Sequence, residues 1–440
     1  MRNAKLKKLW DTLRSSYWFL PSLMATAGMF LAFAMLALDQ TDAIKTGELS
    51  WIYRGGPEGA RGLLSAVASS MVTVAATAFS ITIVALQLAA SNFGPRLLRN
   101  FMQDTGNQVV LGTFIATFLY CLLVLRTVHG EDYNLFVPQL SVTIGIILAI
   151  ASIGVLIYFI HHASTIIQAS HVIAGVADEL DDAIDRLFPE EMGQAEPKDH
   201  SVIEAIPTNF DSQARLISST HTGYLQVIDD QLLLKLACKY NLLLRLASKP
   251  GQFIGKGDRL IWVYPGERVN QKLTSEINRA FLLGKERTEQ QDIEFPINQL
   301  VEIALRALSP GINDPFTAIR CIDRLTAGLS RLAECNFPSV YRYDPEHKLR
   351  VIAEPVAFTQ LVDSAFDQIR HYGKSDIAVT LHLLGAIARI GSHIRHSRDR
   401  LALEQHADMI LQGSREELSM QRDQQRVEEL YQQMMATWRK

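Results

Sequence analysis

Four long stretches without Asp, Glu, Lys or Arg dominate the first 177 residues, and they constrain the fold more than any other feature. Each is at least as long as the roughly 20 residues that a helix needs to cross a hydrocarbon core of about 30 Å. The sequence therefore predicts an α-helical integral membrane protein with four transmembrane helices. We expect the spans at about 17–38, 63–92, 106–126 and 136–160.

The first stretch also follows a basic start, "MRNAKLKK", as a signal peptide would. Its apolar run is longer than the 7–15 residues typical of a signal peptide, and "LALDQTD" offers no clear small-residue cleavage site. We therefore interpret it as a retained first span.

The distribution of Lys and Arg predicts the orientation of the spans. Seven basic residues lie before the first span or after the second, against four in the two opposite loops. Because basic residues favour the cytoplasmic side, we expect both termini and the large C-terminal part in the cytoplasm. The four cysteines show no C-x-x-C spacing and are expected to stay reduced. The net charge of −3 and the lack of a basic run give no indication of nucleic-acid binding.

Downstream of the spans, the pattern predicts a C-terminal cytoplasmic α+β part. Apolar residues keep a helical spacing from Ile150 to Leu187, which indicates that the fourth helix continues as a connector with an acidic face. "PEEMGQAEPKDH" is the best linker, short β-like runs follow to Pro265, and the chain beyond Pro265 is expected to be helical. The expected parts are a membrane domain (1–165), a connector and linker (166–200), a small β-rich module (201–266) and a helical domain (267–440).

The second stretch carries many small hydroxylated residues, which is unusual for a span. At about 100° per residue, seven polar positions fall within about 120° of the helix circumference. One interpretation is packing, because small residues let neighbouring helices approach closely. The other is a polar face that lines a pore at an oligomer axis, which the amide of Gln87 favours. The seven candidates are Ser65, Ser69, Thr73, Thr77, Ser80, Gln87 and Ser91.

The end of this stretch is a candidate cytoplasmic mouth. Gly94 and Pro95 disfavour a continuing straight helix, and Arg96 and Arg99 belong at the membrane interface. A bend here would suit a gate, although a simple helix stop explains the same residues. The candidate face carries no charge that would select ions, whereas the two arginines would favour anions.

"SPGINDP" is the sharpest motif after the spans. Pro310 and Gly311 are expected to end one helix, and Asp314 to cap the next, with Pro315 at its first position. Local physics thus predicts a tight helix–turn–helix connector, and Asn313 and Asp314 are the candidates for a polar site. The complete candidate set is Ser309, Pro310, Gly311, Asn313, Asp314 and Pro315.

Together with "GYLQVIDD", "SNFGPRLLRNF" and the four spans, the string "SPGINDPFTA" resembles the bacterial predicted membrane proteins grouped as domain of unknown function 2254. The resemblance covers nearly the whole chain. It implies an N-terminal four-helix membrane part and a C-terminal cytoplasmic part. It brings no established activity and no catalytic residues.

No motif indicates an enzyme, a cofactor or a metal. "GQFIGKG" has the wrong spacing for a phosphate-binding loop, and no G-x-S-x-G or H-E-x-x-H string is present. His382, His393 and His396 could approach one another on helices, but no Cys or acidic ligand joins them at motif spacing. His161 and His162 lie where the fourth span should leave the membrane, as interfacial anchors or as a pH-sensing pair.

Two functions from different classes follow from these patterns. The first is an oligomeric inner-membrane channel for ions, with the second span lining the axis. The second is a membrane-anchored sensor or scaffold whose cytoplasmic part binds a ligand or a protein through the "SPGINDP" region. The expected partners are the lipid bilayer, further copies of the chain and, for a channel, ions.

Overall fold

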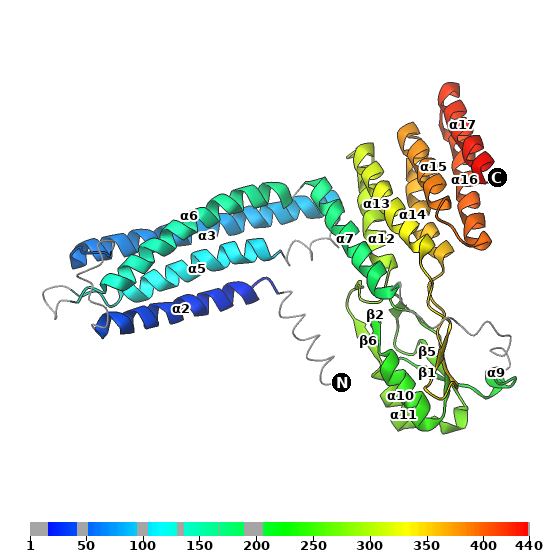
Figure 1. Cartoon of the computed structure of the whole chain (residues 1–440), viewed down its shortest axis with the longest axis horizontal. Coiled ribbons are helices and arrows are strands. Elements are labelled where there is room, and N and C mark those ends of the chain that lie inside the picture. The colour runs from blue at the N-terminus through cyan, green and yellow to red at the C-terminus, as the bar shows by residue number, and fades with distance from the viewer. Residues whose placement is uncertain are drawn as a thin grey trace. The chain divides into compact units, whose positions relative to one another are not determined.

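A computed structural model describes residues 16–41, 52–94, 104–129, 136–166, 168–188 and 206–438. The chain divides into two compact units, Met1–Val172 and Ile173–Lys440. Four apolar helices come first, and a mixed α+β region with two small sheets and C-terminal helices follows (Figure 1). The predicted fold class is confirmed.

The first unit consists of four helices that run alongside one another (Figure 1). All four are long and apolar enough to cross a membrane, so the protein is a multi-pass membrane protein. Pro57 begins the second helix, where its missing N–H costs nothing, and Asp104 caps the third by accepting the N–H of Asn107 at 2.9 Å. The helices are α2 (Phe19–Gln40), α3 (Pro57–Phe93), α5 (Thr105–Leu125) and α6 (Gln139–Ile166).

Helix α5 is the centre of this unit and packs against the other three. In its most apolar window 44% of the residues are buried, against 17% for α3. At the α2–α5 crossing, a Cβ added at Gly28 would lie 2.8 Å from the carbonyl oxygen of Ala116. The two backbones therefore approach so closely that only glycine fits at this position.

The carboxylate of Asp39, at the end of α2, caps the start of α6. It accepts the N–H of Leu140 at 3.0 Å, and the N–H and hydroxyl of Ser141 at 2.9 and 2.6 Å. The first N–H groups of a helix have no partner within it, and the positive end of the helix dipole favours a negative charge. This cap therefore joins the first span to the fourth.

The predicted continuous helix from Ile150 to Leu187 is wrong, because the structure has two helices there. Helix α6 ends at Ile166 and α7 spans Ala169–Leu187, while residue 167 lies outside the described residues. The carbonyl of Gln168 accepts the N–H groups of His171 at 2.9 Å and Val172 at 3.1 Å, as at the start of a new helix. The periodicity of the apolar residues continues across this junction, which is why the sequence did not indicate it.

The second unit contains a five-stranded sheet, ordered β1-β5-β3-β8-β7, and a three-stranded sheet, ordered β4-β2-β6. Among the strands of the described residues, only β3 and β8 pair in parallel. Leu225, Leu244 and Ile261 are fully buried between the sheets and their helices. The strands are β1 (Arg215–Ser218), β2 (Gly223–Ile228), β3 (Leu243–Leu246), β4 (Phe253–Ile254), β5 (Arg259–Tyr264), β6 (Phe281–Gly284), β7 (Tyr341–Tyr343) and β8 (Leu349–Ile352). The short helices are α9 (Phe210–Gln213), α10 (Asp230–Tyr240), η3 (Gly266–Arg268) and α11 (Gln271–Asn278).

The prediction that the chain beyond Pro265 is helical is wrong for β6, β7 and β8. Strand β6 pairs with β2. The β7–β8 hairpin extends the larger sheet, where β8 pairs with β3, a strand that precedes it by about a hundred residues. These strands have only three or four residues each, so their alternating pattern is too short to separate them from the helical runs around them.

Six helices complete the second unit as three helical hairpins. Helix α14 packs between α12 and α16, and α15 packs between α13 and α17, so the six helices form two layers. Ile297, Leu325 and Ile387 are fully buried in the core between these layers. The helices are α12 (Glu294–Ala307), α13 (Pro315–Glu334), α14 (Phe358–Gly373), α15 (Ile377–Gly391), α16 (Ser397–Glu417) and α17 (Gln421–Trp438).

The acidic face of α7 is used for packing. The guanidinium of Arg331 on α13 donates to Asp181 and Asp185, each at 2.5 Å. Two N–H groups of Arg186 donate to the carbonyls of Gln290 and Glu289, at 3.2 and 2.6 Å. From Ile173 onward, α7 is therefore an integral helix of the second unit.

Candidate functional site

The seven polar candidates on α3 all lie on the surface of the single chain. The residues of α3 that are buried against the other spans form a stripe on the opposite side, centred about 180° from the middle of the polar face at 100° per residue. The polar face is thus directed away from the chain's own helices. The buried stripe consists of Ala60, Leu64, Ala68, Met71, Ala78, Thr82, Ala85, Ala89 and Phe93.

Four of the six hydroxyl groups on this face donate to carbonyls of their own helix. The side chains of Thr73, Thr77 and Ser80 donate to the carbonyl four residues earlier at 3.0, 2.9 and 2.8 Å, and Ser69 donates to Ala66 at 3.2 Å. Gln87 differs, because its amide makes no hydrogen bond within the described residues. Wherever an exposed amide lies within the hydrocarbon core, it needs water or a second chain as its partner.

Helix α3 is also much longer than a membrane is thick. Its 37 residues extend about 55 Å at 1.5 Å per residue, against a hydrocarbon core of about 30 Å. The helix ends at Phe93, and Gly94 follows it with a φ of 111°, which lies in the region that favours glycine. The N–H of Gly94 donates to the carbonyl of Ala90 at 3.2 Å. Pro95, Arg96 and Arg99 lie outside the described residues, so the candidate mouth stays a prediction.

A side-chain contact between the start of α5 and α6 was not indicated by the sequence. The Nε2 of His162 lies 2.7 Å from the carboxylate of Asp104, and both side chains are only 19% exposed. Tyr158 stacks on the imidazole, with 5.2 Å between the ring centroids. Gly106 leaves room for both rings, since a Cβ there would lie 2.7 Å from His162. The sequence singled out His162, but Asp104 lies 58 positions away and had no motif to mark it.

The "SPGINDP" segment forms the predicted turn between α12 and α13. Asp314 caps α13 by accepting the N–H and the hydroxyl of Thr317 at 3.2 and 2.6 Å, and Pro315 is the first helical residue. Asn313 has a positive φ of 51°. The side chains of Asn313 and Pro310 and the backbone of Gly311 are exposed. The carboxylate of Asp314 is thus engaged in capping. Asn313 lies on the surface beside it, and the predicted polar site stays a prediction.

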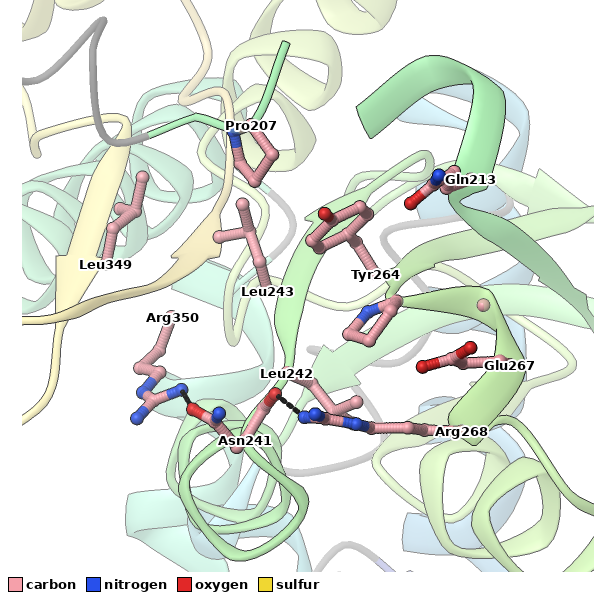
Figure 2. A pocket seen from close by; sticks show the side chains of 12 residues that line it. Pro207, Gln213, Asn241, Leu242, Leu243, Tyr264, Glu267, Arg268, Leu349 and Arg350 are labelled. Carbon is pink, nitrogen blue, oxygen red and sulfur yellow. Dashed lines mark hydrogen bonds between the residues drawn. The ribbon is translucent and has the colours of Figure 1, made fainter. Parts of the chain in front are cut away.

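A cleft of about 660 Å³ opens in the β-rich part of the second unit, where no candidate residue had been expected (Figure 2). Asn241 lies between two arginines in this cleft. Its side-chain oxygen accepts from Arg350 at 2.6 Å, and its carbonyl accepts from Arg268 at 2.6 Å (Figure 2). The cleft is lined by Pro207, Gln213, Asn241, Leu242, Leu243, Tyr264, Pro265, Gly266, Glu267, Arg268, Leu349 and Arg350.

The two arginines differ in their electrostatic environment. Arg350 is only 8% exposed, and its Nε donates to Asp344 at 2.7 Å. The N–H of Lys348 and the Arg350 guanidinium hold the pKa of Asp344 below its usual range. Arg268 is exposed, and its Nη1 donates to the carbonyls of Tyr240 and Asn241. Its Nε and Nη2 make no hydrogen bond within the described residues, so they can bind an anion.

The candidate histidines of the helical domain are engaged separately. His382 pairs with Asp323 at 2.7 Å, and His393 with Glu334 at 2.6 Å. Within the described ranges, no three His, Cys, Asp or Glu side chains come together as metal ligands would. The structure therefore does not bring the candidate histidines into one site.

Comparison with known proteins confirms the resemblance drawn from the motifs. The family described as "Predicted membrane protein (DUF2254)" matches residues 14–389. Uncharacterised proteins of Mycobacterium bovis and Mycobacterium tuberculosis are 32% identical over 428 residues, which cover 95% of this chain and 80% of each relative. No solved structure matches the chain.

Proposed function

Since this chain belongs to the DUF2254 family of predicted membrane proteins, its first unit works within a bilayer, and we propose that it forms an oligomeric channel with α3 lining the axis. The observation that carries this proposal is the direction of the polar face of α3. Seven polar side chains point away from the chain's own spans, and the Gln87 amide makes no hydrogen bond within the described residues. In lipid, an amide gains hydrogen bonds only from water or another protein chain.

A ring of copies would give this face an aqueous lining. Side-chain hydroxyls and an amide would line the path, without a charged ring within the span. The Lys and Arg distribution supports a cytoplasmic location for both termini and the second unit. The mycobacterial origin of the relatives supports a bacterial inner membrane. Arg96 and Arg99 would then lie at the cytoplasmic mouth and favour anions. The proposal assigns the protein no catalytic activity.

Conductance in a reconstituted bilayer tests the proposal. We expect Gln87→Leu and Ser80→Leu each to reduce the single-channel conductance several-fold, because each replaces a polar lining group with an apolar one that disfavours water. Phe79→Leu is the matched control, since Phe79 is 45% exposed on α3 but lies about 100° from Ser80. Unchanged currents in both polar-face variants, or an equal loss in the control, would contradict an α3-lined path.

The cleft supports a second candidate function, a sensor that binds a small anion. Arg268 offers free guanidinium donors beside the buried Arg350, and such groups recognise carboxylate and phosphate. We expect inorganic phosphate to raise the thermal midpoint of the full-length protein, and Arg268→Gln to remove this shift. Arg259→Gln is the control, because Arg259 is exposed at the far end of β5 from Tyr264. A shift that survives Arg268→Gln would place the anion elsewhere.

A further inference from the structure

The three helical hairpins of the second unit turn at the same end of their bundle (Figure 1). The turns follow α12, α14 and α16. The Nζ of Lys374, just after α14, lies 2.7 Å from the carboxylate of Glu417 at the end of α16. A Cβ added at Gly373 would lie 3.5 Å from the side chain of Leu308, just after α12. We name the surface formed by the three turns and the adjoining helix ends the hairpin end.

Large apolar side chains are exposed at each turn of the hairpin end. Phe316 is 73% exposed and Ile312 is 45% exposed at the first turn. Tyr372 is 59% exposed at the second, and Met420 is 63% exposed at the third. Single exposed apolar residues are ordinary, but four gathered on the turns of one bundle end mark a surface that meets something apolar.

Helix α7 runs alongside α13 in the second unit. Leu180 lies against Gly328, Asp185 pairs with Arg331, and Phe188 stacks on Phe337. Residue numbers thus increase together on α7 and α13, so the two helices run in the same direction. The part of α7 that belongs to the second unit, from Ile173 onward, therefore starts on the side of the bundle where α13 begins.

The chain between the fourth span and α7 is short. Helix α6 ends at Ile166 and α7 begins at Ala169. At a maximum of about 3.6 Å per residue, this connection reaches only about 11 Å. The second unit therefore follows the membrane spans through a short covalent connection.

The charges at the first turn also suit a lipid surface. Arg320 is exposed one helical turn after Phe316 and makes no ion pair within the described residues. Of the carboxylates at these turns, Asp314 and Asp376 cap α13 and α15, and Glu417 pairs with Lys374. The exposed Glu416 accepts the side-chain N–H of Gln412. A basic residue beside an exposed aromatic ring is the combination by which interfacial segments bind anionic membranes.

We propose that the hairpin end is a membrane-docking surface, at which Phe316, Tyr372 and their apolar neighbours enter the headgroup region of an anionic bilayer. The surface would fix the second unit against the membrane in which the first unit is embedded. This role is independent of whether the spans conduct ions. The other plausible occupant, a second copy of the chain, is an outcome of the test below.

The test measures the depth of a spin label in the full-length protein. Labels are attached at Phe316→Cys or Tyr372→Cys after Cys238→Ser and Cys335→Ser, because Cys121 and Cys321 are buried. Leu401→Cys is the matched control, since Leu401 is 55% exposed near the start of α16, at the opposite end of the bundle. The protein is reconstituted in vesicles of phosphatidylethanolamine and phosphatidylglycerol.

We expect the ratio of oxygen to nickel-chelate accessibility to be several-fold higher at 316 and 372 than at 401, as for groups within lipid. Arg320→Glu should lower the ratio at 316, because it places a negative charge beside the anionic headgroups. Equal aqueous accessibility at all three positions would overturn the proposal. Low accessibility to both reagents at 316 and 372 would also overturn it, because it would show a protein partner there.

Discussion

Gly28→Val is expected to destabilise the membrane unit by about 1–3 kcal/mol, the usual cost of overpacking a tight core. A Cβ at this position would lie 2.8 Å from the carbonyl oxygen of Ala116 and 3.1 Å from its Cα. These are backbone atoms of α5, so no side-chain rotation can relieve the clash and α2 must move away. Titration of the detergent-solubilised protein with sodium dodecyl sulfate, followed by circular dichroism, measures the change in unfolding free energy.

Gly154→Val provides the matched control for this experiment. Gly154 lies within α6 as Gly28 lies within α2, but a Cβ there would meet nothing within 4 Å. The same β-branched side chain therefore adds no contact, and we expect little change in stability. If both variants unfolded at the same detergent fraction, the close α2–α5 crossing would be incorrect.

The second large effect is a cross-link between copies of the chain. On oxidation in the membrane, we expect Thr73→Cys to give a covalent dimer in most molecules, because a channel brings the polar faces of neighbouring α3 helices together. Phe79→Cys should remain monomeric, since residue 79 lies about 120° around the helix from residue 73. Both experiments use the chain with Cys238→Ser and Cys335→Ser, and non-reducing gel electrophoresis measures the product.

A double variant separates a ring from a simple pair. Ala76 and Thr77 are both exposed on the two flanks of the polar face, about 100° apart but only about 1.5 Å apart along the helix. In a ring, each flank of one copy faces the other flank of the next at the same depth, so Ala76→Cys with Thr77→Cys should give a ladder of products beyond the dimer. Dimers alone would indicate that the small residues serve pairwise packing. No product at Thr73 would place this face against lipid and remove the basis for the channel.

Local features of the fold could be predicted from the sequence because their causes are local. Charge-free stretches longer than a membrane is thick indicate spans without any knowledge of the tertiary structure. The turn at 308–314 could be predicted equally well, because its causes are close in sequence. Asp314 caps the next helix through a residue three positions away, and Pro315 fits its first position. The helix after this turn begins where the motif placed it.

Features that join distant parts of the chain could not be predicted. The β7–β8 hairpin becomes part of a sheet only because β3 offers Leu244 and Arg245 as parallel partners. The pairing of Asp104 with His162 and the cleft around Asn241 likewise depend on residues far apart in sequence. The direction of the polar face on α3 could not be predicted either. The periodicity shows that polar residues share one face of the helix, but not whether this face points toward the other spans or away from them.

The Asp39 cap has a consequence for biosynthesis. Asp39 and the N–H group of Leu140 that it binds are 101 positions apart, so the ribosome completes the first span long before the fourth exists. Until then, the carboxylate at the end of the first span lacks its partner, and insertion of the fourth span supplies it. The first three spans therefore lack one of the contacts that hold the finished four-helix unit together.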